Sequence, residues 1–377
     1  MSAIRQCARC VMDTSDPNIT FDSNNVCDHC QTFEKEILPS WNFGKNQESK
    51  LEDILKRIKK DSVDSEFNCI LGMSGGVDSS YLLHLLVNEF GLKPLVFHVD
   101  GGWNTKLAVE NIENIVNALN LDLYTEVINW REMQDLQRSF FKSGVSHIDT
   151  PQDHAFFAKM YEFANKYKIK SIITGGNYST ECIRNPKNWM YYQSDKVQII
   201  DIQKKFGTLK LTQFPLVNIF WYKFYLPIFK NIKLYRLLDY VEYNKEEALN
   251  LLEKKYNYQR YPQKHFESRF TKFYESYWLY ERFGYDVRKV QLSSLILTNQ
   301  LKRQEALQIL LGKPYTNEYL RLEKEYIANK LDVSMSTLED YFSLSKKTYK
   351  DYKNQENFYK IGTKIFRFFG FEKGGKR

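Results

Sequence analysis

Apolar runs of strand length alternate with amphipathic helical stretches through the first half of the chain. Strands are predicted at 69–73, 94–100, 121–128 and 171–174, and helices from residue 79, over 107–119 and over 151–167. Short apolar runs separated by helices of this length are typical of a parallel sheet with helices on both faces. The pattern therefore predicts an α/β fold built on a doubly wound parallel sheet.

The segments on either side of this region have different patterns. Residues 1–45 lack helical periodicity and hold four of the six cysteines, and a polar stretch at 42–50 follows. From 216 to 377, helical patterns rich in Lys, Glu, Leu and Tyr dominate. We therefore predict a cysteine-rich, zinc-ribbon-like module at 1–45, an α/β domain at 50–215, and a mainly helical C-terminal region at 216–377.

Composition narrows the class of protein only a little. The 377 residues are 43% hydrophobic and 27% charged, which is ordinary for a globular protein. A net charge of +8 suits nucleic acid, an anionic membrane surface or phosphorylated small molecules, and we favour the last. The N-terminal residues lack the apolar run of a secretory signal, which predicts a cytoplasmic location with reduced thiols.

An aromatic segment at 214–229 is the most apolar stretch of the chain. Two prolines, an asparagine and a lysine interrupt it, so no transmembrane segment is predicted. Its aromatic side chains can form either a surface for a membrane or partner, or a buried core element, which we favour. They are Phe220, Trp221, Tyr222, Phe224 and Tyr225.

Two Cys-x-x-Cys pairs lie near the N-terminus, Cys7 with Cys10 and Cys27 with Cys30. Their spacing is typical of a closed tetrahedral zinc site. A redox pair and an iron–sulfur ligand set are the alternatives. The four-thiolate pattern favours Zn²⁺ in a structural role, with no open position for chemistry.

The sharpest chemical signal is the heptapeptide at 74–80, Ser-Gly-Gly-Val-Asp-Ser-Ser, between a predicted strand and a predicted helix. Gly75 and Gly76 let backbone N–H groups approach an anion, and Ser79 and Ser80 bring hydroxyls to the same helix N-terminus. The motif lacks the lysine of a Walker A loop. It therefore favours chemistry at the α-phosphate of ATP, with pyrophosphate as the leaving group.

This motif resembles the PP-loop of the ATP pyrophosphatase superfamily, which includes the synthetases for GMP, NAD, asparagine and argininosuccinate and the tRNA thiolases. The resemblance implies adenylation of an oxygen followed by displacement of AMP, with Mg²⁺ at Asp78. His98 and Asp100, at the end of the next strand, are expected beside the adenosine. The implied phosphate-binding residues are Ser74, Gly75, Gly76, Asp78 and Ser79, and Ser80 is added to the predicted site because it lies at the same helix N-terminus.

Further segments at 151–155, 174–177, 264–273 and 283–289, together with the paired cysteines, resemble the N-acetyl sugar amidotransferases of the WbpG and PseA type. The resemblance runs from Cys7 to about Leu311. We expect Thr150 to cap a helix that carries Asp153 and His154 on its first turn, where they orient substrate or metal. Gly175 and Asn177 are expected beside the bound nucleotide.

The 264–273 segment is predicted to be helical, with Lys264, Ser268 and Lys272 on one face and His265 beside Arg269. Such a basic face is ordinarily solvated. The resemblance favours a role with pyrophosphate or a nucleotide sugar. The predicted catalytic residues are therefore Asp78, Asp153, His154, Lys264, His265 and Arg269.

The resemblance implies conversion of an acetamido group on a nucleotide sugar to an acetamidino group in lipopolysaccharide O-antigen or other surface-polysaccharide synthesis. ATP adenylates the amide oxygen, and ammonia displaces AMP. A glutaminase needs an activated cysteine, but position 2 is serine and Cys69 lies inside a predicted strand. The resemblance implies separate partners similar to the glutaminase and cyclase subunits of imidazole-glycerol-phosphate synthase.

Two other functions fit parts of the sequence. A tRNA thiolation enzyme would use Cys182 as sulfur carrier, but no second core cysteine obviously pairs with it. A zinc-ribbon nucleic-acid-binding protein would have a degenerate nucleotide site, against which Gly76, Asp78 and Ser79 argue. We therefore expect no nucleic-acid partner.

Overall fold

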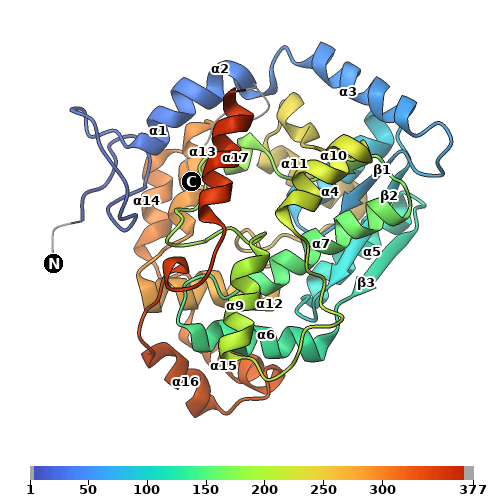
Figure 1. Ribbon diagram of the computed structural model, residues 1–377. Helices are drawn as coiled ribbons and strands as arrows, with labels where there is room; N and C mark the ends of the chain where they lie inside the picture. Colours follow the sequence, from blue (N-terminus) through green and yellow to red (C-terminus); the bar gives the residue numbers. More distant parts are fainter. Residues whose placement is uncertain (1–3, 369–377) are drawn as a thin grey trace.

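The chain folds around a five-stranded parallel sheet in the computed structural model, which describes residues 4–368 (Figure 1). The strand order is β3-β2-β1-β4-β5, and every pairing is parallel. The connections run one way from β1 and the other way from β4, so the carboxyl ends of these two strands flank a topological switch point. The strands are β1 Cys69–Gly72, β2 Pro94–Asp100, β3 Leu123–Val127, β4 Ser171–Ile173 and β5 Lys233–Tyr235. The predicted doubly wound sheet is confirmed.

The fifth strand, β5, was not predicted. It is three residues long and lies past the predicted boundary at residue 215. Such a short strand has no room for a recognisable alternation of apolar and polar side chains. It pairs with β4 at the edge of the sheet, from Ser171 opposite Lys233 to Ile173 opposite Tyr235.

Helices cover both faces of the sheet, and the alternation along β1 divides the core accordingly. Ile70 belongs to one buried cluster, whereas Cys69 and Leu71 belong to the other, because successive strand residues point to opposite faces. The Cys69 face packs against α3 Glu48–Asp61, α4 Val77–His84, α5 Lys106–Ala118 and α11 Lys245–Tyr256. The Ile70 face packs against α6 Trp130–Ser143, α7 Thr150–Lys166, α9 Lys196–Phe206 and α12 Arg269–Phe273.

Helix α7 begins one residue earlier than expected. Thr150 is already its first residue, Asp149 occupies the N-cap position, and Pro151 lies in the first turn as predicted. The prediction that Thr150 caps the helix is therefore wrong. Its hydroxyl is buried and has no hydrogen-bond partner among residues 4–368.

The C-terminal region is mainly helical, as predicted; α11 and α12 pack against the sheet, whereas α13, α14 and α16 lie farther from it (Figure 1). The N-terminal segment packs against it, because Cys7, Phe33 and Trp41 share a buried cluster with Val290 and Leu297. The remaining α-helices are α1 Asp28–Thr32, α2 Leu38–Trp41, α8 Tyr178–Glu181, α10 Leu226–Phe229, α13 Arg288–Leu297, α14 Arg303–Leu311, α15 Asn317–Lys330, α16 Met335–Ser343 and α17 Glu356–Phe368. The π-helices are η1 Phe33–Ile37, η3 Leu85–Glu89, η4 Trp221–Tyr225 and η6 Tyr274–Phe283. The 3-10 helices within residues 4–368 are η2 Asn42–Gly44, η5 Leu237–Tyr240 and η7 Tyr349–Asp351.

The aromatic segment over η4 and α10 is buried on one side only. Tyr222 and Leu226 are in the core, and the Tyr222 ring lies 4.6 Å from that of Phe157. Phe220 and Phe229 are exposed. The core interpretation thus holds for one side of the segment. Within residues 4–368, no helix combines the length and apolar character needed to cross a lipid bilayer.

Candidate active site

The PP-loop motif forms a tight turn between β1 and α4. Gly75 has a φ of +84°, and a Cβ on it would lie 2.8 Å from the carbonyl oxygen of Ala108. A Cβ on Gly76 would collide with the Glu267 carboxylate. Glycine is therefore needed at position 75, whereas a Cβ at position 76 would displace only the end of the Glu267 side chain. Because α4 starts at Val77, the N–H groups of its first turn are available to an anion bound over the loop.

The serines of the motif divide into two groups. Ser74 Oγ accepts from the Gly76 N–H at 3.2 Å, and the Ser79 hydroxyl donates to the Gly76 carbonyl at 3.1 Å. Both serines line a cavity over the loop. Ser80 is fully buried and lines neither cavity described below. Ser74 and Ser79 thus face the cavity over the loop, whereas the Ser80 side chain faces the core.

Asp78 lies in the first turn of α4, and each of its carboxylate oxygens accepts a hydrogen bond. The Tyr243 hydroxyl donates to Oδ1 at 2.7 Å, and Lys264 Nζ donates to Oδ2 at 2.9 Å. Lys264 also contacts Glu181 at 2.6 Å. Burial alone would raise the pKa of Asp78, but the Lys264 charge outweighs it and holds the pKa below its usual range. The two carboxylates likewise raise the pKa of Lys264 despite its burial.

The segment that carries Lys264 is not the predicted helix. Helix α12 begins only at Arg269, with Ser268 as its N-cap, and His265 has a φ of +67°. Backbone hydrogen bonds hold the segment against the loop after β2, from Thr105 N–H to the Glu267 carbonyl and from Arg269 N–H to the Trp103 carbonyl. The predicted basic helical face is therefore wrong. The irregular path instead brings Lys264, His265 and Glu267 over the PP-loop.

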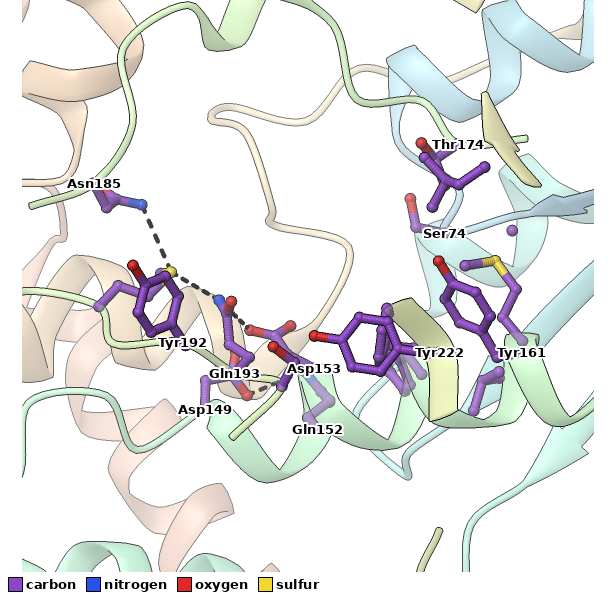
Figure 2. A pocket seen from close by; sticks show the side chains of 18 of the residues that line it. Ser74, Asp149, Gln152, Asp153, Tyr161, Thr174, Asn185, Tyr192, Gln193 and Tyr222 are labelled. Carbon is purple, nitrogen blue, oxygen red and sulfur yellow. Dashed lines mark hydrogen bonds between the residues drawn. The ribbon is translucent and has the colours of Figure 1, made fainter. Parts of the chain in front are cut away.

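Two cavities meet at this point. The smaller, about 250 Å³, lies over the PP-loop and is lined by Asp78, Lys245 and Lys264 among others. The larger, about 1210 Å³, extends from the carboxyl ends of β1, β2 and β4 across α7 (Figure 2). The residues common to both linings are Gly72, Ser74, Gly175, His265 and Glu267. The space over the PP-loop is therefore continuous with the larger cavity, and a group bound over the loop would face into that cavity.

The predicted residues at the strand ends separate into lining and supporting groups. His98 lines the larger cavity; its Nδ1–H donates to the Met73 carbonyl and its Nε2 accepts from Asn104. Gly175 lies at the junction and packs against the first turn of α4. Asp100 and Asn177 line neither cavity. Asp100 accepts from the Gly102 N–H at 2.7 Å, and Asn177 caps α8.

Asp153 and His154 are neighbours on α7 with different environments. Asp153 lines the larger cavity, and its Oδ2 accepts from Gln193 Nε2 at 3.1 Å. His154 is fully buried outside both cavities, donating from Nδ1 to the Gln193 carbonyl and accepting at Nε2 from the Val217 N–H. Burial lowers the pKa of His154 to about 4. The expected substrate or metal role of His154 is therefore corrected to a structural one.

Arg269 also lies away from both cavities. Its guanidinium makes two hydrogen bonds to Glu323, at 3.1 and 2.7 Å, and stacks 3.4 Å from the Tyr326 ring. These contacts join α12 to α15. The prediction that Arg269 takes part in catalysis is therefore replaced by a role in packing two helices together.

Several cavity residues were not predicted. Asp149, Glu267, Tyr274 and Glu275 all line the larger cavity. Asp149 lies two positions before the 151–155 segment, but it has no sequence signal of its own. Glu275 accepts from His265 Nδ1–H at 2.8 Å. Burial alone would lower the pKa of His265, but the Glu275 charge outweighs it and raises the pKa to about 9.

The four N-terminal cysteines come together in one buried cluster. Their sulfur atoms all lie within 4.8 Å of one another, with Cys7 to Cys30 at 3.9 Å and Cys10 to Cys27 at 3.6 Å. Tetrahedral zinc with bonds of about 2.3 Å requires sulfur atoms about 3.8 Å apart. Backbone N–H groups of Cys10 and Cys27 also donate to Cys7 Sγ. This donor set fits a metal ion.

The other two cysteines are buried thiols. Cys69 lies in β1 and Cys182 follows α8, and neither lines a cavity. Burial raises the pKa of each to about 12. A sulfur carrier needs an accessible thiolate. The environment of Cys182 therefore disfavours the tRNA thiolation alternative.

Comparison with protein families agrees with this geometry. The phosphoadenosine phosphosulfate reductase domain, a PP-loop family, matches residues 68–258, about half of the chain, and the C-terminal domain of WbpG-like lipopolysaccharide biosynthesis proteins matches residues 267–366. The chain belongs to the PP-loop superfamily and is of the WbpG type. The ATP-utilising domain and the WbpG-like domain thus meet between residues 258 and 267, where Lys264 and His265 lie.

Two curated proteins resemble parts of this WbpG-type chain. An uncharacterized protein of Methanocaldococcus jannaschii is 34% identical over 171 residues, which cover 45% of this chain and 58% of that protein. A glutamine-hydrolyzing GMP synthase of Chlamydia muridarum is 27% identical over 207 residues, which cover 53% and 35%. The chain thus spans between about a third and three fifths of the length of these relatives.

Two solved structures were also found. The NMN synthetase of Francisella tularensis is 16% identical, covering 80% of this chain and 98% of its own, with a TM-score of 0.30. The NH₃-dependent NAD synthetase of Campylobacter jejuni is also 16% identical, covering 55% and 84%, with a TM-score of 0.29.

Proposed function

We propose that this protein is an ATP-dependent C–N ligase that converts the acetamido group of a nucleotide-activated sugar to an acetamidino group. The observation that carries the proposal is the junction of the two cavities, where the PP-loop opens into a volume of about 1210 Å³. The WbpG-like region supplies one wall of that volume, including Ser268, Thr271 and Glu275. An adenylating site thus adjoins room for a large second substrate.

ATP is proposed to bind with its phosphates over the PP-loop. Gly75 and Gly76 allow the approach, and Ser74, Ser79 and the N-terminus of α4 offer hydrogen-bond donors. Lys264 and Lys245 line the same cavity and can neutralise the departing pyrophosphate. Mg²⁺, which would shield the phosphate charge, is proposed to be held through Asp78. In this arrangement the adenosine is proposed to lie beside His98 and Gly175, which both line the larger cavity.

The sugar nucleotide is proposed to occupy the larger cavity. Its walls combine aromatic side chains such as Phe156 and Tyr192 with the cations Arg184 and Lys187. Aromatic faces suit a base or sugar ring, and the cations suit its diphosphate. The acetamido oxygen must then reach the junction, where Ser74 and His265 lie.

The proposed reaction has two steps. The amide oxygen attacks the α-phosphorus of ATP, so an O–P bond forms and pyrophosphate leaves. Ammonia then adds to the imidate carbon, and the C–O bond breaks to release AMP and an amidinium. Adenylation is needed because a neutral amide oxygen is a poor leaving group. The contribution of the protein is positioning and charge stabilisation.

The ammonia is proposed to come from a glutaminase partner, with a cyclase-like subunit as a second candidate partner. Cys7, Cys10, Cys27 and Cys30 form the cluster, and Cys69 and Cys182 are buried thiols with raised pKa. A glutaminase nucleophile must be activated and accessible. We further propose that the cluster holds structural Zn²⁺ and that the enzyme serves O-antigen or related polysaccharide synthesis in the cytoplasm.

The direct test is to incubate the protein with ATP, ammonium and UDP- or CMP-linked acetamido sugars. The expected product is lighter than the substrate by the difference between an oxygen atom and an NH group, and it forms together with AMP and pyrophosphate. The Asp78→Asn variant serves as the inactive control. Release of phosphate and ADP in place of AMP, or no mass change with any acetamido sugar, would contradict the proposal.

A further inference from the structure

Three carboxylates converge on one part of the larger cavity, and the proposed nucleotide does not account for them. Asp149 and Asp153 come from the start of α7, and Glu275 comes from η6. Figure 2 shows Asp149, Asp153 and Gln193 close together, on the opposite side of the view from Ser74. Asp149 is only 2% exposed and Glu275 6% exposed. A nucleotide site gains nothing from buried negative charge.

These carboxylates have few protein partners. Asp149 accepts from the Thr271 hydroxyl at 2.6 Å and from Gln152, and Asp153 accepts from Gln193. Glu275 accepts from His265. Each ionised carboxylate has about four acceptor sites. Acceptor capacity therefore remains for a ligand that carries several N–H donors.

Tyr274 provides an independent indication that this part of the cavity binds a ligand. It is 1% exposed and lines the same cavity, yet its hydroxyl has no hydrogen-bond partner among residues 4–368. Burial and the charges of Asp149, Glu275 and Asp153 raise its pKa, as expected for a hydroxyl that lines the same cavity as the three carboxylates. Burying a hydroxyl without a hydrogen-bond partner costs free energy, so we expect a bound group to form a hydrogen bond with it.

The proposed reaction turns a neutral amide into a cation. Its nucleophile is supplied as ammonium, and its product is an amidinium, and both are small cations with N–H donors on several sides. We propose that Asp149, Asp153 and Glu275, together with the Tyr274 hydroxyl, form a cation site that binds the incoming ammonium and then the amidinium group of the product. This inference rests on the amidination proposed above.

The site also accounts for the proton that the reaction releases. Ammonium transfers one proton to a carboxylate of the cluster and becomes ammonia. The ammonia lone pair then forms the C–N bond while the C–O bond electrons leave with AMP. The amidinium retains its positive charge, so one proton per turnover passes from the carboxylate to solvent. The cluster thus acts both as proton acceptor and as counter-charge.

The ionisation of the cluster is compatible with this role. Burial raises the pKa of Asp153 to about 6 against the opposing charge of His265, and burial and the Asp153 charge raise the pKa of Asp149 well above its usual range. The groups that face them are His265, Glu275 and Tyr274. Burial and mutual repulsion thus disfavour the ionisation of Asp149 and Asp153 at the same time. A bound cation favours loss of the second proton.

The site can be tested with acetamidinium and its neutral analogue acetamide, titrated calorimetrically into the full chain. We expect acetamidinium to bind at least about tenfold more tightly than acetamide, with ammonium as competitor. Tyr274→Phe removes a hydroxyl that has no internal partner, so it should fold normally while weakening acetamidinium about fivefold. Asp153→Asn keeps an acceptor for Gln193 and should weaken it about tenfold or more. Asp122→Asn, on the exposed surface, is the matched control.

Two outcomes separate this inference from the proposed function. If acetamidinium binds as expected but no acetamido sugar supports pyrophosphate release, the cation site stands and the amidination proposal fails. If the wild-type protein forms amidine but Asp153→Asn and Tyr274→Phe retain its KM for ammonium and its acetamidinium affinity, the cation site is wrong. Equal binding of acetamide and acetamidinium would also overturn it.

Discussion

Lys264 places its ammonium group 2.9 Å from the Asp78 carboxylate, although 186 positions separate the two residues in the chain. The contact joins the PP-loop to the segment between the ATP-utilising and WbpG-like regions. Lys264 also bridges to Glu181 after β4. Three separate segments therefore meet at one cation over the PP-loop, and the chemistry of the site depends on their relative positions.

Replacing Lys264 with glutamine should lower the rate of pyrophosphate release by about tenfold to a hundredfold, because a cation that neutralises the leaving group is lost. A coupled pyrophosphate assay with the sugar substrate measures the effect. Lys254→Gln, an exposed substitution on α11, should leave the rate unchanged. An unaltered rate in folded Lys264→Gln would remove Lys264 from the site.

The Asp78→Asn variant should lose pyrophosphate release while remaining folded. Asparagine can still accept from the Tyr243 hydroxyl, and Lys264 retains Glu181 as its partner. The lost charge removes the proposed metal ligand. Thermal unfolding and the pyrophosphate assay should be measured on the same sample, with exposed Asp64→Asn as control. Normal turnover in the folded variant would mean that the PP-loop assignment is wrong.

Native protein should contain one zinc ion per chain, held by Cys7, Cys10, Cys27 and Cys30. Elemental analysis should find zinc without an iron–sulfur absorption band, and chelation should lower the melting temperature because the cluster packs against Val290 and Leu297. Cys27→Ser should lose the metal, whereas Cys182→Ser should retain it. Iron with acid-labile sulfide in the native protein would instead favour the alternative that the four cysteines bind an iron–sulfur cluster.

The imidazole of His265 should titrate near pH 9, well above its usual value of about 6.5, because of the Glu275 charge. Since the folded-state pKa is raised, this contribution to stability is complete below about pH 6.5 and is lost as pH rises through about 9. NMR titration of the ring measures the midpoint directly. Glu275→Gln should shift it downward, and a midpoint that is unchanged in this variant would rule out the pair as the cause.

The purified protein should turn over with free ammonium but not with glutamine, and adding a glutaminase partner should confer glutamine-dependent activity. The physical reason is that Cys69 and Cys182 are inaccessible thiols and the other four cysteines form the cluster. The assay compares amidine formation from each nitrogen source. Sustained turnover by the isolated chain with glutamine as sole nitrogen source would contradict this prediction.

The PP-loop and the paired cysteines could be read from the sequence because each depends on neighbouring residues. A strand, two glycines and a helix start occur within a dozen positions, and their local geometry determines the turn. The strands β1, β2 and β4 were predicted for the same reason, since burial on both faces requires continuous apolar runs. Local patterns of this kind survive in almost any tertiary setting.

The roles of individual polar residues depended on contacts with distant parts of the chain. His154 and Asp153 are adjacent, yet only the Asp153 side chain reaches the cavity. Both ring nitrogens of His154 are hydrogen-bonded to backbone groups, those of Gln193 and Val217. The 264–273 segment has helical spacing, but residues 264–267 form turns, and backbone hydrogen bonds to Trp103 and Thr105 hold the residues just before α12. Helical periodicity cannot reveal such competing partners.

What the sequence determined by itself was the fold class, the phosphate-binding turn and the cysteine ligands. The acid cluster of Asp149, Asp153 and Glu275 was decided only by the tertiary structure, which brings η6 against the start of α7. No consecutive motif marks these residues, because a carboxylate on a helix is usually solvated. Burial and mutual approach give them their shifted pKa values and the proposed function of the site. Both properties arise from packing between segments that are more than a hundred residues apart.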